Sequence, residues 1–81
     1  MVIMKKIEVL FGIVVRRHRQ ELDISQEDFA DKAGIHRTYV SSIELGKVQV
    51  SIGIAQQLAD TLGVPLSQLW QEIEKDASGE G

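Results

Sequence analysis

The chain has 81 residues and a formal net charge of −3 at pH 7. This length allows one small domain, and because domains of this size have limited cores, we expect an oligomer. It has no cysteine and two distant histidines, which excludes a disulfide scaffold or thiolate metal site and suits a reducing cytoplasm, so we expect neither metal nor cofactor. No apolar run approaches the ~20 residues that span a bilayer, so we expect a cytoplasmic protein without membrane contact.

The N-terminal part of the sequence predicts a short extension followed by an amphipathic helix. Residues 1–6 form the extension, and the helix is expected over residues 7–22, where apolar side chains recur at three- and four-residue steps. A basic turn at residues 16–19 lies near its end, where cations interact favourably with the helix dipole. We expect His18 within this turn to be packed or solvated. The apolar side chains are Ile7, Leu10, Phe11, Val14, Val15 and Leu22.

Residues 25–46 predict two short helices joined by a tight turn, a candidate helix-turn-helix. Ser25 is a good N-cap, and Asp28 three residues later completes a capping-box-like pair. Gly34 stands where the chain leaves the first helix and can adopt a left-handed conformation. The second helix is expected over residues 37–45, and a Gly residue follows it.

The outer face of the predicted helix at residues 37–45 is polar and short-chained. At about 100° per residue, this face carries Thr38, Ser41, Ser42 and Leu45, flanked by Arg37 and Tyr39. Small hydroxyl groups allow a helix to approach closely, and an arginine near the helix start can reach base edges. The sequence therefore predicts a helix that fits the major groove of duplex DNA.

Two further helices complete the predicted fold. Ser51 is an N-cap for a helix over residues 52–62, and Pro65 provides a rigid first residue for a last helix that extends to residue 75. The last helix carries an apolar stripe that is large for its length. Part of the stripe must cover the core, and we interpret the rest as a homodimer surface, since Trp is enriched at interfaces. The stripe comprises Leu66, Leu69, Trp70 and Ile73, and residues 76–81 are expected to be a disordered tail.

Four sequence patterns together resemble one known family. They are FGxxVRxxR at residues 11–19, SQEDFADKAG at 25–34, HRTYVSSIELGK at 36–47 and LADTLGV at 58–64. In this combination they resemble the lambda-repressor-like, or XRE-type, helix-turn-helix DNA-binding domains over about residues 10 to 74. The stretch GIHRTYVSSIELGK is especially similar to the short controller proteins of restriction–modification systems. The resemblance implies an all-α, five-helix domain over residues 7–75 that binds double-stranded DNA.

The resemblance also implies roles for individual residues, to be weighed against simpler ones. Base contacts are expected from Thr38 and Ser42, whose alternative is a solvated face, and from Arg37, which could instead clamp a phosphate. Tyr39 could offer its hydroxyl to a phosphate or only pack. The expected backbone contacts are Gln26, Arg16, His36, Tyr39, Ser41, Lys47 and Gln49, and His36 is expected to be a weak N-cap. Arg19 and Glu44 are expected to form a structural ion pair between the first helix and the DNA-reading helix.

Two features of the charge distribution limit the expected affinity for DNA. Residues 1–47 hold eight Lys/Arg and seven Asp/Glu, a balance of +1, whereas residues 48–81 hold one Lys and five Asp/Glu, a balance of −4. Many relatives carry basic or polar residues where this chain has Leu45 and Val48. Each lost phosphate contact should flatten the salt dependence of binding by about one unit of slope.

We interpret the chain as a homodimeric transcription regulator that binds a near-palindromic operator. It would repress by occluding RNA polymerase or activate by touching it, and the sequence gives no small-molecule site. The alternative is an antitoxin-like protein-interaction module of the same fold, which the acidic C-terminal half and the apolar last helix also fit. An enzyme is not expected, because no nucleophile with a supporting base, phosphate loop or metal-ligand spacing occurs in the sequence.

Overall fold

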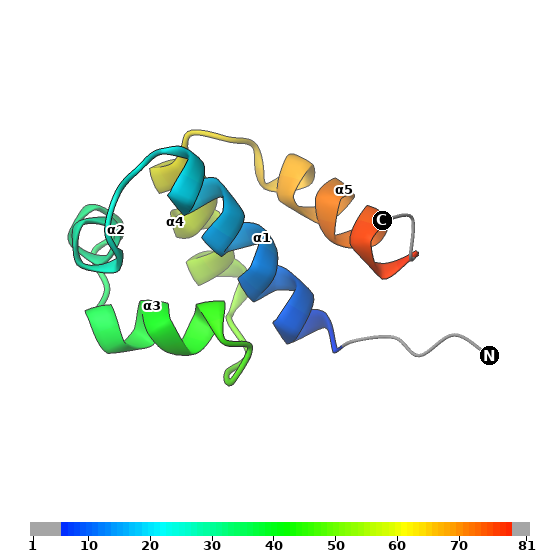
Figure 1. Cartoon of the computed structure of the whole chain (residues 1–81), viewed down its shortest axis with the longest axis horizontal. Helices are drawn as coiled ribbons and strands as arrows, with labels where there is room; N and C mark the ends of the chain where they lie inside the picture. The colour runs from blue at the N-terminus through cyan, green and yellow to red at the C-terminus, as the bar shows by residue number, and fades with distance from the viewer. Residues whose placement is uncertain (1–5, 79–81) are drawn as a thin grey trace.

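The computed structural model describes residues 6–78, so the predicted N-terminal extension lies outside the described residues except for Lys6. The described residues form five helices and no strand, so the expected all-α class is confirmed. The helices are α1 (Ile7–Glu21), α2 (Gln26–Ala33), α3 (Arg37–Glu44), α4 (Ile52–Leu62) and α5 (Leu66–Ala77). In Figure 1, α1 runs through the middle of the molecule, with α2 and α3 on one side and α5 on the other.

The local signals read from the sequence set several helix ends. The Ser25 hydroxyl accepts a hydrogen bond from the Asp28 backbone N–H at 3.0 Å, and Ser51 caps α4 in the same way through Ile54. Gly34 ends α2 with a φ of 74°, in the left-handed region that costs glycine little. Ser25 and Gly34 thus set the two ends of α2, and Gly34 begins the tight turn to α3.

Other ends differ from expectation by one or two residues. α1 stops at Glu21, so Leu22 is a C-cap and 48% exposed rather than part of a buried stripe. α3 stops at Glu44, with Leu45 as its C-cap. Pro65 occupies the N-cap position of α5 instead of its first helical position.

The last helix continues two residues past the expected end at residue 75. Asp76 and Ala77, the first two residues of the predicted disordered tail, are helical. Asp76 lies 3.5 Å from the Arg17 guanidinium of α1, and Ala77 packs against the core. These tertiary contacts, which local composition does not encode, lengthen the helix, while residues 79–81 lie outside the described part.

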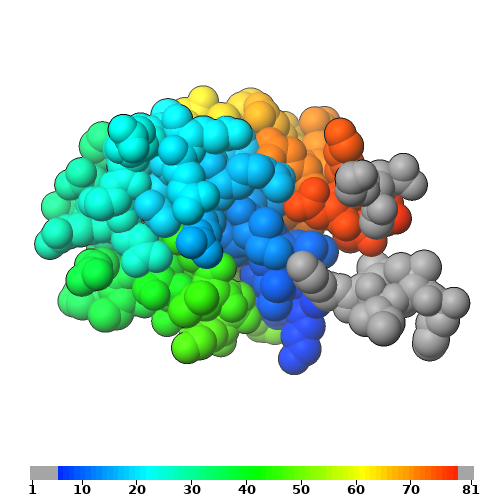
Figure 2. Space-filling view, viewed as in Figure 1, coloured from blue at the N-terminus to red at the C-terminus, as the bar shows by residue number. Residues whose placement is uncertain are grey.

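The core lies between α1 and the other four helices. Its largest fully buried side chains are Phe29, Ile43, Leu58, Leu69, Ile73, Val14, Val15 and Val40. α1 contacts α3, α4 and α5, and α2 contacts α3 and α4. Figure 2 shows that α3 and the loop after it form the lower edge of one face of the molecule. None of the described helices is long and apolar enough to cross a bilayer.

Gly12 allows α1 and α3 to approach each other closely. A Cβ at this position would overlap the carbonyl oxygen of Ile43 and lie 2.7 Å from that of Glu44. Both oxygens belong to the end of α3, so only a residue without a side chain fits beneath it. Sequence reasoning assigned Gly12 no role, although it sets the depth at which α3 sits on the domain.

Candidate nucleic-acid interface

The two faces of α3 have opposite characters. Val40 and Ile43 are each 1% exposed and face the core, which fixes the rotation of the helix about its axis. Arg37 and Thr38 are exposed on the other side, and Ser42, one turn after Thr38, is half-buried. The three residues expected to contact bases therefore lie on or beside the solvent-facing side of α3.

The first turn of α3 is organised by His36. Its Nδ1 accepts a hydrogen bond from the Thr38 backbone N–H at 3.1 Å, and the same Nδ1 lies 2.8 Å from the Thr38 hydroxyl oxygen. The sequence predicted a weak cap here. The structure adds a side-chain contact between the cap and Thr38, which spacing alone did not indicate.

An ion pair ties α3 to α1. Arg19 Nε lies 2.6 Å from one Glu44 oxygen and Arg19 Nη2 lies 3.0 Å from the other, a two-point contact. Arg19 Nη1 also donates to the carbonyl oxygen of Ile24 at 2.8 Å. The Glu44 side chain is 2% exposed and that of Arg19 is 11% exposed. The pair thus holds the C-terminal end of α3 from within the domain.

Gln26 belongs to the same network. Its side-chain amide donates to Glu44 Oε1 at 3.0 Å, so α2 is joined to the α1–α3 pair. Sequence reasoning placed Gln26 at a phosphate and missed this internal bond. A phosphate contact through the second amide hydrogen stays a prediction.

The other expected backbone contacts occupy different environments. Arg16 and Lys47 are exposed, whereas Ser41 and Tyr39 are half-buried and the Tyr39 ring packs against the core. Arg16 borders a shallow hollow that it shares with residues of α1 and with Glu44. Arg16 and Lys47 are therefore the two expected contacts that are cationic and open to solvent.

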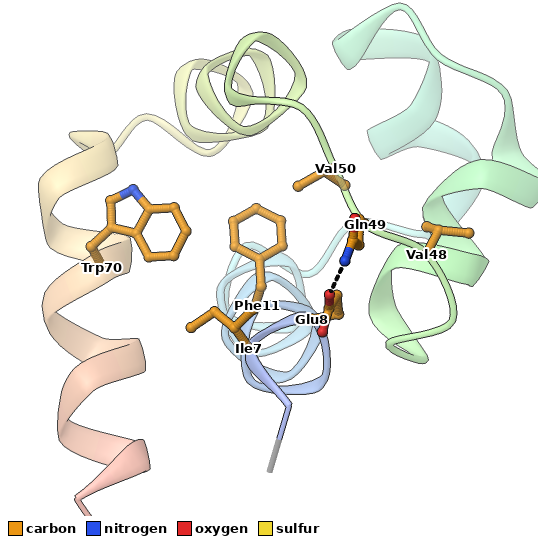
Figure 3. Close-up of a pocket in the computed structure, with 7 residues that line it drawn as sticks. All are labelled: Ile7, Glu8, Phe11, Val48, Gln49, Val50 and Trp70. Atoms are coloured by element: carbon orange, nitrogen blue, oxygen red, sulfur yellow. Dashed lines mark hydrogen bonds between the residues drawn. The ribbon is translucent and has the colours of Figure 1, made fainter. Parts of the chain in front are cut away.

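Gln49 has a partner within the domain. Its amide donates to Glu8 Oε2 of α1 at 2.8 Å (Figure 3). A backbone hydrogen bond at Glu8 itself and then this bond from Gln49 lower the pKa of the Glu8 carboxyl. The neighbouring carboxylate would repel a phosphate, so a contact of Gln49 with the DNA backbone, through its second amide hydrogen or after release from Glu8, stays a prediction.

A charged cluster that the sequence did not reveal joins the end of α1 to α5. Glu72 lies 3.0 Å from Arg17 and 2.8 Å from His18, whose side chain is 12% exposed. Burial works to raise the pKa of Glu72, but hydrogen bonds from His18, Arg17 and Gln68 outweigh it and lower that pKa. The hydrogen bond to Glu72 raises the pKa of Arg17. Part of the acidic C-terminal half is therefore paired internally.

The expected dimer residues on α5 separate into two groups. Leu69 and Ile73 are 0% and 1% exposed, so these two side chains face the protomer's own core and are not available to a partner. Leu66 is half-buried, and Trp70 is 38% exposed with its ring centroid 5.9 Å from that of Phe11. The interface expected from the sequence is thus reduced on α5 to Leu66 and Trp70.

Trp70 forms one wall of an open, largely apolar groove. The groove has a volume of about 200 Å³ and lies between α5, the start of α1 and the loop after α3 (Figure 3). Beyond this loop, Ile52 at the start of α4 is 82% exposed. The lining residues are Ile7, Glu8, Phe11, Val48, Gln49, Val50 and Trp70.

The comparisons with known proteins agree with this arrangement. A family model described as helix-turn-helix matches residues 15–69, which include α2, the turn and α3. The chain belongs to this XRE-type helix-turn-helix family. Its members are DNA-binding transcription regulators and not enzymes, so double-stranded DNA is a partner of this chain.

Similar proteins include several control proteins. The control protein C.MunI of a Mycoplasma species is 42% identical over 74 residues, which cover 90% of this chain and all of that protein. C.BamHI of Bacillus amyloliquefaciens is 41% identical over 59 residues, covering 72% of this chain and 73% of its own. The structure of the restriction-modification controller protein C.AhdI from Aeromonas hydrophila superposes with a TM-score of 0.74 at 34% identity, covering 76% of this chain and 90% of its own.

Proposed function

We propose that the protein is a homodimeric transcription regulator that reads a near-palindromic operator with two copies of α3. The observation that carries this proposal is the exposed, short-chained face of α3, with Arg37 and Thr38 at the helix start and Ser42 one turn later. A two-fold dimer would place the two helices in successive major grooves, with half-site centres about 34 to 36 Å apart.

The proposed dimer surface is centred on Trp70 and the groove beside it. Trp70 is the chain's single tryptophan and is partly exposed on α5, and Ile7 and Ile52 near the groove are 50% and 82% exposed. A second copy covering this surface would remove an apolar patch from water. The groove also adjoins the loop that follows α3, so a partner seated there would lie near the end of the proposed DNA-reading helix.

We propose further that the protein controls genes of a restriction–modification system. Similarity to C.MunI, C.BamHI and C.AhdI supports this setting. At monomer concentrations below the dissociation constant of the dimer, occupancy of the operator would then rise with the square of the monomer concentration. In this proposal the bound protein represses by occluding RNA polymerase or activates by touching it.

Selection from random-sequence duplexes tests the proposed function. The purified protein and the Arg37→Ala and Ser42→Ala variants are each incubated with the pool near 0.15 M salt, and bound DNA is sequenced after several rounds. We expect the wild-type protein to enrich an inverted repeat, and each variant to change preference at symmetric positions. Enrichment of no sequence by a folded protein would refute the proposal and favour a protein partner.

Sedimentation tests the dimer separately. Trp70→Glu should shift the protein towards the monomer, because it places a charge in an apolar interface. Gln56→Glu, at an exposed position of α4, is the matched control for added charge. Circular dichroism verifies that both variants keep the helical fold, and an unchanged dimer in Trp70→Glu would refute the location of the interface.

A further inference from the structure

We propose that His36 fixes the hydrogen-bonding mode of Thr38, so that Thr38 accepts from a base amino group and does not donate to a base carbonyl. This inference rests on the proposed function and names the base chemistry that α3 selects. A threonine hydroxyl is both donor and acceptor, so an unconstrained Thr38 could bind either kind of group in the major groove. The contact between His36 and Thr38 removes that ambiguity.

The first step is the protonation of the imidazole. The Thr38 backbone N–H donates to His36 Nδ1 at 3.1 Å. A nitrogen that accepts this bond has a free lone pair, so Nδ1 is unprotonated and the ring hydrogen of the neutral side chain is on Nε2. The helix cap therefore sets the tautomer of His36.

The second step is the orientation of the hydroxyl. Thr38 Oγ1 lies 2.8 Å from the same Nδ1, and two atoms that both present lone pairs repel each other at this separation. The hydroxyl hydrogen must therefore point at Nδ1, which accepts from the backbone N–H and from the hydroxyl together. The oxygen lone pairs are then left as acceptors on a residue that is exposed at the start of α3.

The consequence is a specific preference. An outward-facing acceptor matches the amino hydrogens on N6 of adenine or N4 of cytosine, and it repels O4 of thymine and O6 of guanine. The Nε2 hydrogen of His36 remains a donor for a phosphate oxygen, which fits the expected backbone contact of this residue. His36 is thus a positioning residue for a base contact made by Thr38.

Synthetic duplexes with single groups removed test the inference. In the sequence enriched by the wild-type protein, the base pair read by Thr38 is the one whose preference changes in Thr38→Val. At this pair, purine for adenine or 2-pyrimidinone for cytosine removes the amino group. 5-Methyl-2-pyrimidinone for thymine or 2-aminopurine for guanine removes the carbonyl oxygen. Dissociation constants are measured by fluorescence anisotropy.

Loss of the amino group should weaken wild-type binding by about two- to tenfold, the effect of one hydrogen bond. Measured relative to the unmodified duplex, the same loss should not weaken binding by Thr38→Val. Loss of the carbonyl oxygen should change the dissociation constants of both proteins by the same factor. In His36→Ser, which keeps a strong helix cap but frees the Thr38 hydroxyl, the dependence on the amino group should fall towards that of Thr38→Val.

Three results would overturn the inference: a Thr38-dependent loss on removing the carbonyl, an undiminished dependence on the amino group in His36→Ser, or no base pair that responds to Thr38→Val. Each of these can occur while the wild-type protein still enriches an inverted repeat, in which case the proposed function survives. If the wild-type protein enriches no sequence, the proposed function fails and the inference fails with it.

Discussion

Separating Arg19 from Glu44 should destabilise the domain far more than removing both. The Arg19 side chain is only 11% exposed, and in Glu44→Leu its guanidinium keeps the carbonyl oxygen of Ile24 as an acceptor but loses both carboxylate oxygens. The Gln26 amide also loses its acceptor. Breaking a buried pair from one side costs about 3 to 5 kcal/mol, because a charge is left without its partner.

The size of this loss can be compared with the stability of the whole domain. At roughly 0.05 to 0.15 kcal/mol per residue, a chain of 81 residues has a free energy of unfolding of about 4 to 12 kcal/mol. The single variants Glu44→Leu and Arg19→Met should therefore lose a quarter or more of it. The double variant buries no charge and leaves only the Gln26 amide and the Ile24 carbonyl oxygen without these partners. Its free energy of unfolding should therefore fall by only about 1 to 2 kcal/mol.

Urea unfolding followed by circular dichroism measures these differences. The wild-type protein, both single variants and the double variant are compared at pH 7 and one protein concentration, since association affects apparent stability. We expect the double variant to be more stable than either single variant. If its loss equals the sum of the two single losses, the two side chains act independently and the reasoning is refuted.

Three further predictions follow from the packing, the charged cluster and the exposed end of α3. Gly12→Ala should lower the free energy of unfolding by about 1 to 3 kcal/mol, because its Cβ would meet the α3 backbone. Gly53→Ala in α4, whose Cβ would lie 3.8 Å from the Ser51 hydroxyl oxygen, should instead be neutral or stabilising by up to ~1 kcal/mol in urea unfolding. The pKa of Glu72 is lowered in the folded protein from its ordinary value of 4.5, so the carboxylate stabilises the fold above that pH and loses this effect as the pH falls. The difference in urea midpoint between wild type and Glu72→Gln should therefore shrink between pH 6 and pH 3. Leu45→Lys, at a site 56% exposed, should strengthen DNA binding and steepen the plot of log affinity against log salt by about one unit.

Each of these predictions has a clear contrary result. Equal stability of Gly12→Ala and Gly53→Ala would show that α1 and α3 can separate without cost. A Glu72→Gln difference that stays constant down to pH 3 would show that the carboxylate does not hold α5 on α1. An unchanged salt slope in Leu45→Lys would place the end of α3 away from the phosphates.

The fold was largely predictable because its signals are local. Ser25 and Ser51 cap helices, Gly34 requires a left-handed turn, and the apolar periodicity of each segment identifies its buried face. The pairing of Arg19 with Glu44 came from the resemblance to a family and not from spacing. The sequence thus predicted the helices and their order, whereas the contacts of α3 with DNA stay a prediction.

The features that sequence reasoning missed depend on which segments meet in three dimensions. Gly12 lies 31 positions before Ile43 in the chain, so its close approach to α3 has no local signal. The same holds for the bonds of Glu72 to the end of α1 and of Gln49 to Glu8. The burial of Leu69 and Ile73 could not be separated from the exposure of Trp70, because all three lie on one apolar stripe.

Binding to an operator with altered spacing tests the central claim most directly, namely that two copies of α3 read adjacent major grooves. The enriched duplex, a version with one half-site scrambled and a version with five extra base pairs between the half-sites are titrated with protein. We expect two chains per enriched duplex. Both alterations should abolish the tight binding, since five base pairs rotate one half-site by about half a turn. Equal affinity for all three duplexes, or one chain per duplex, would contradict the account.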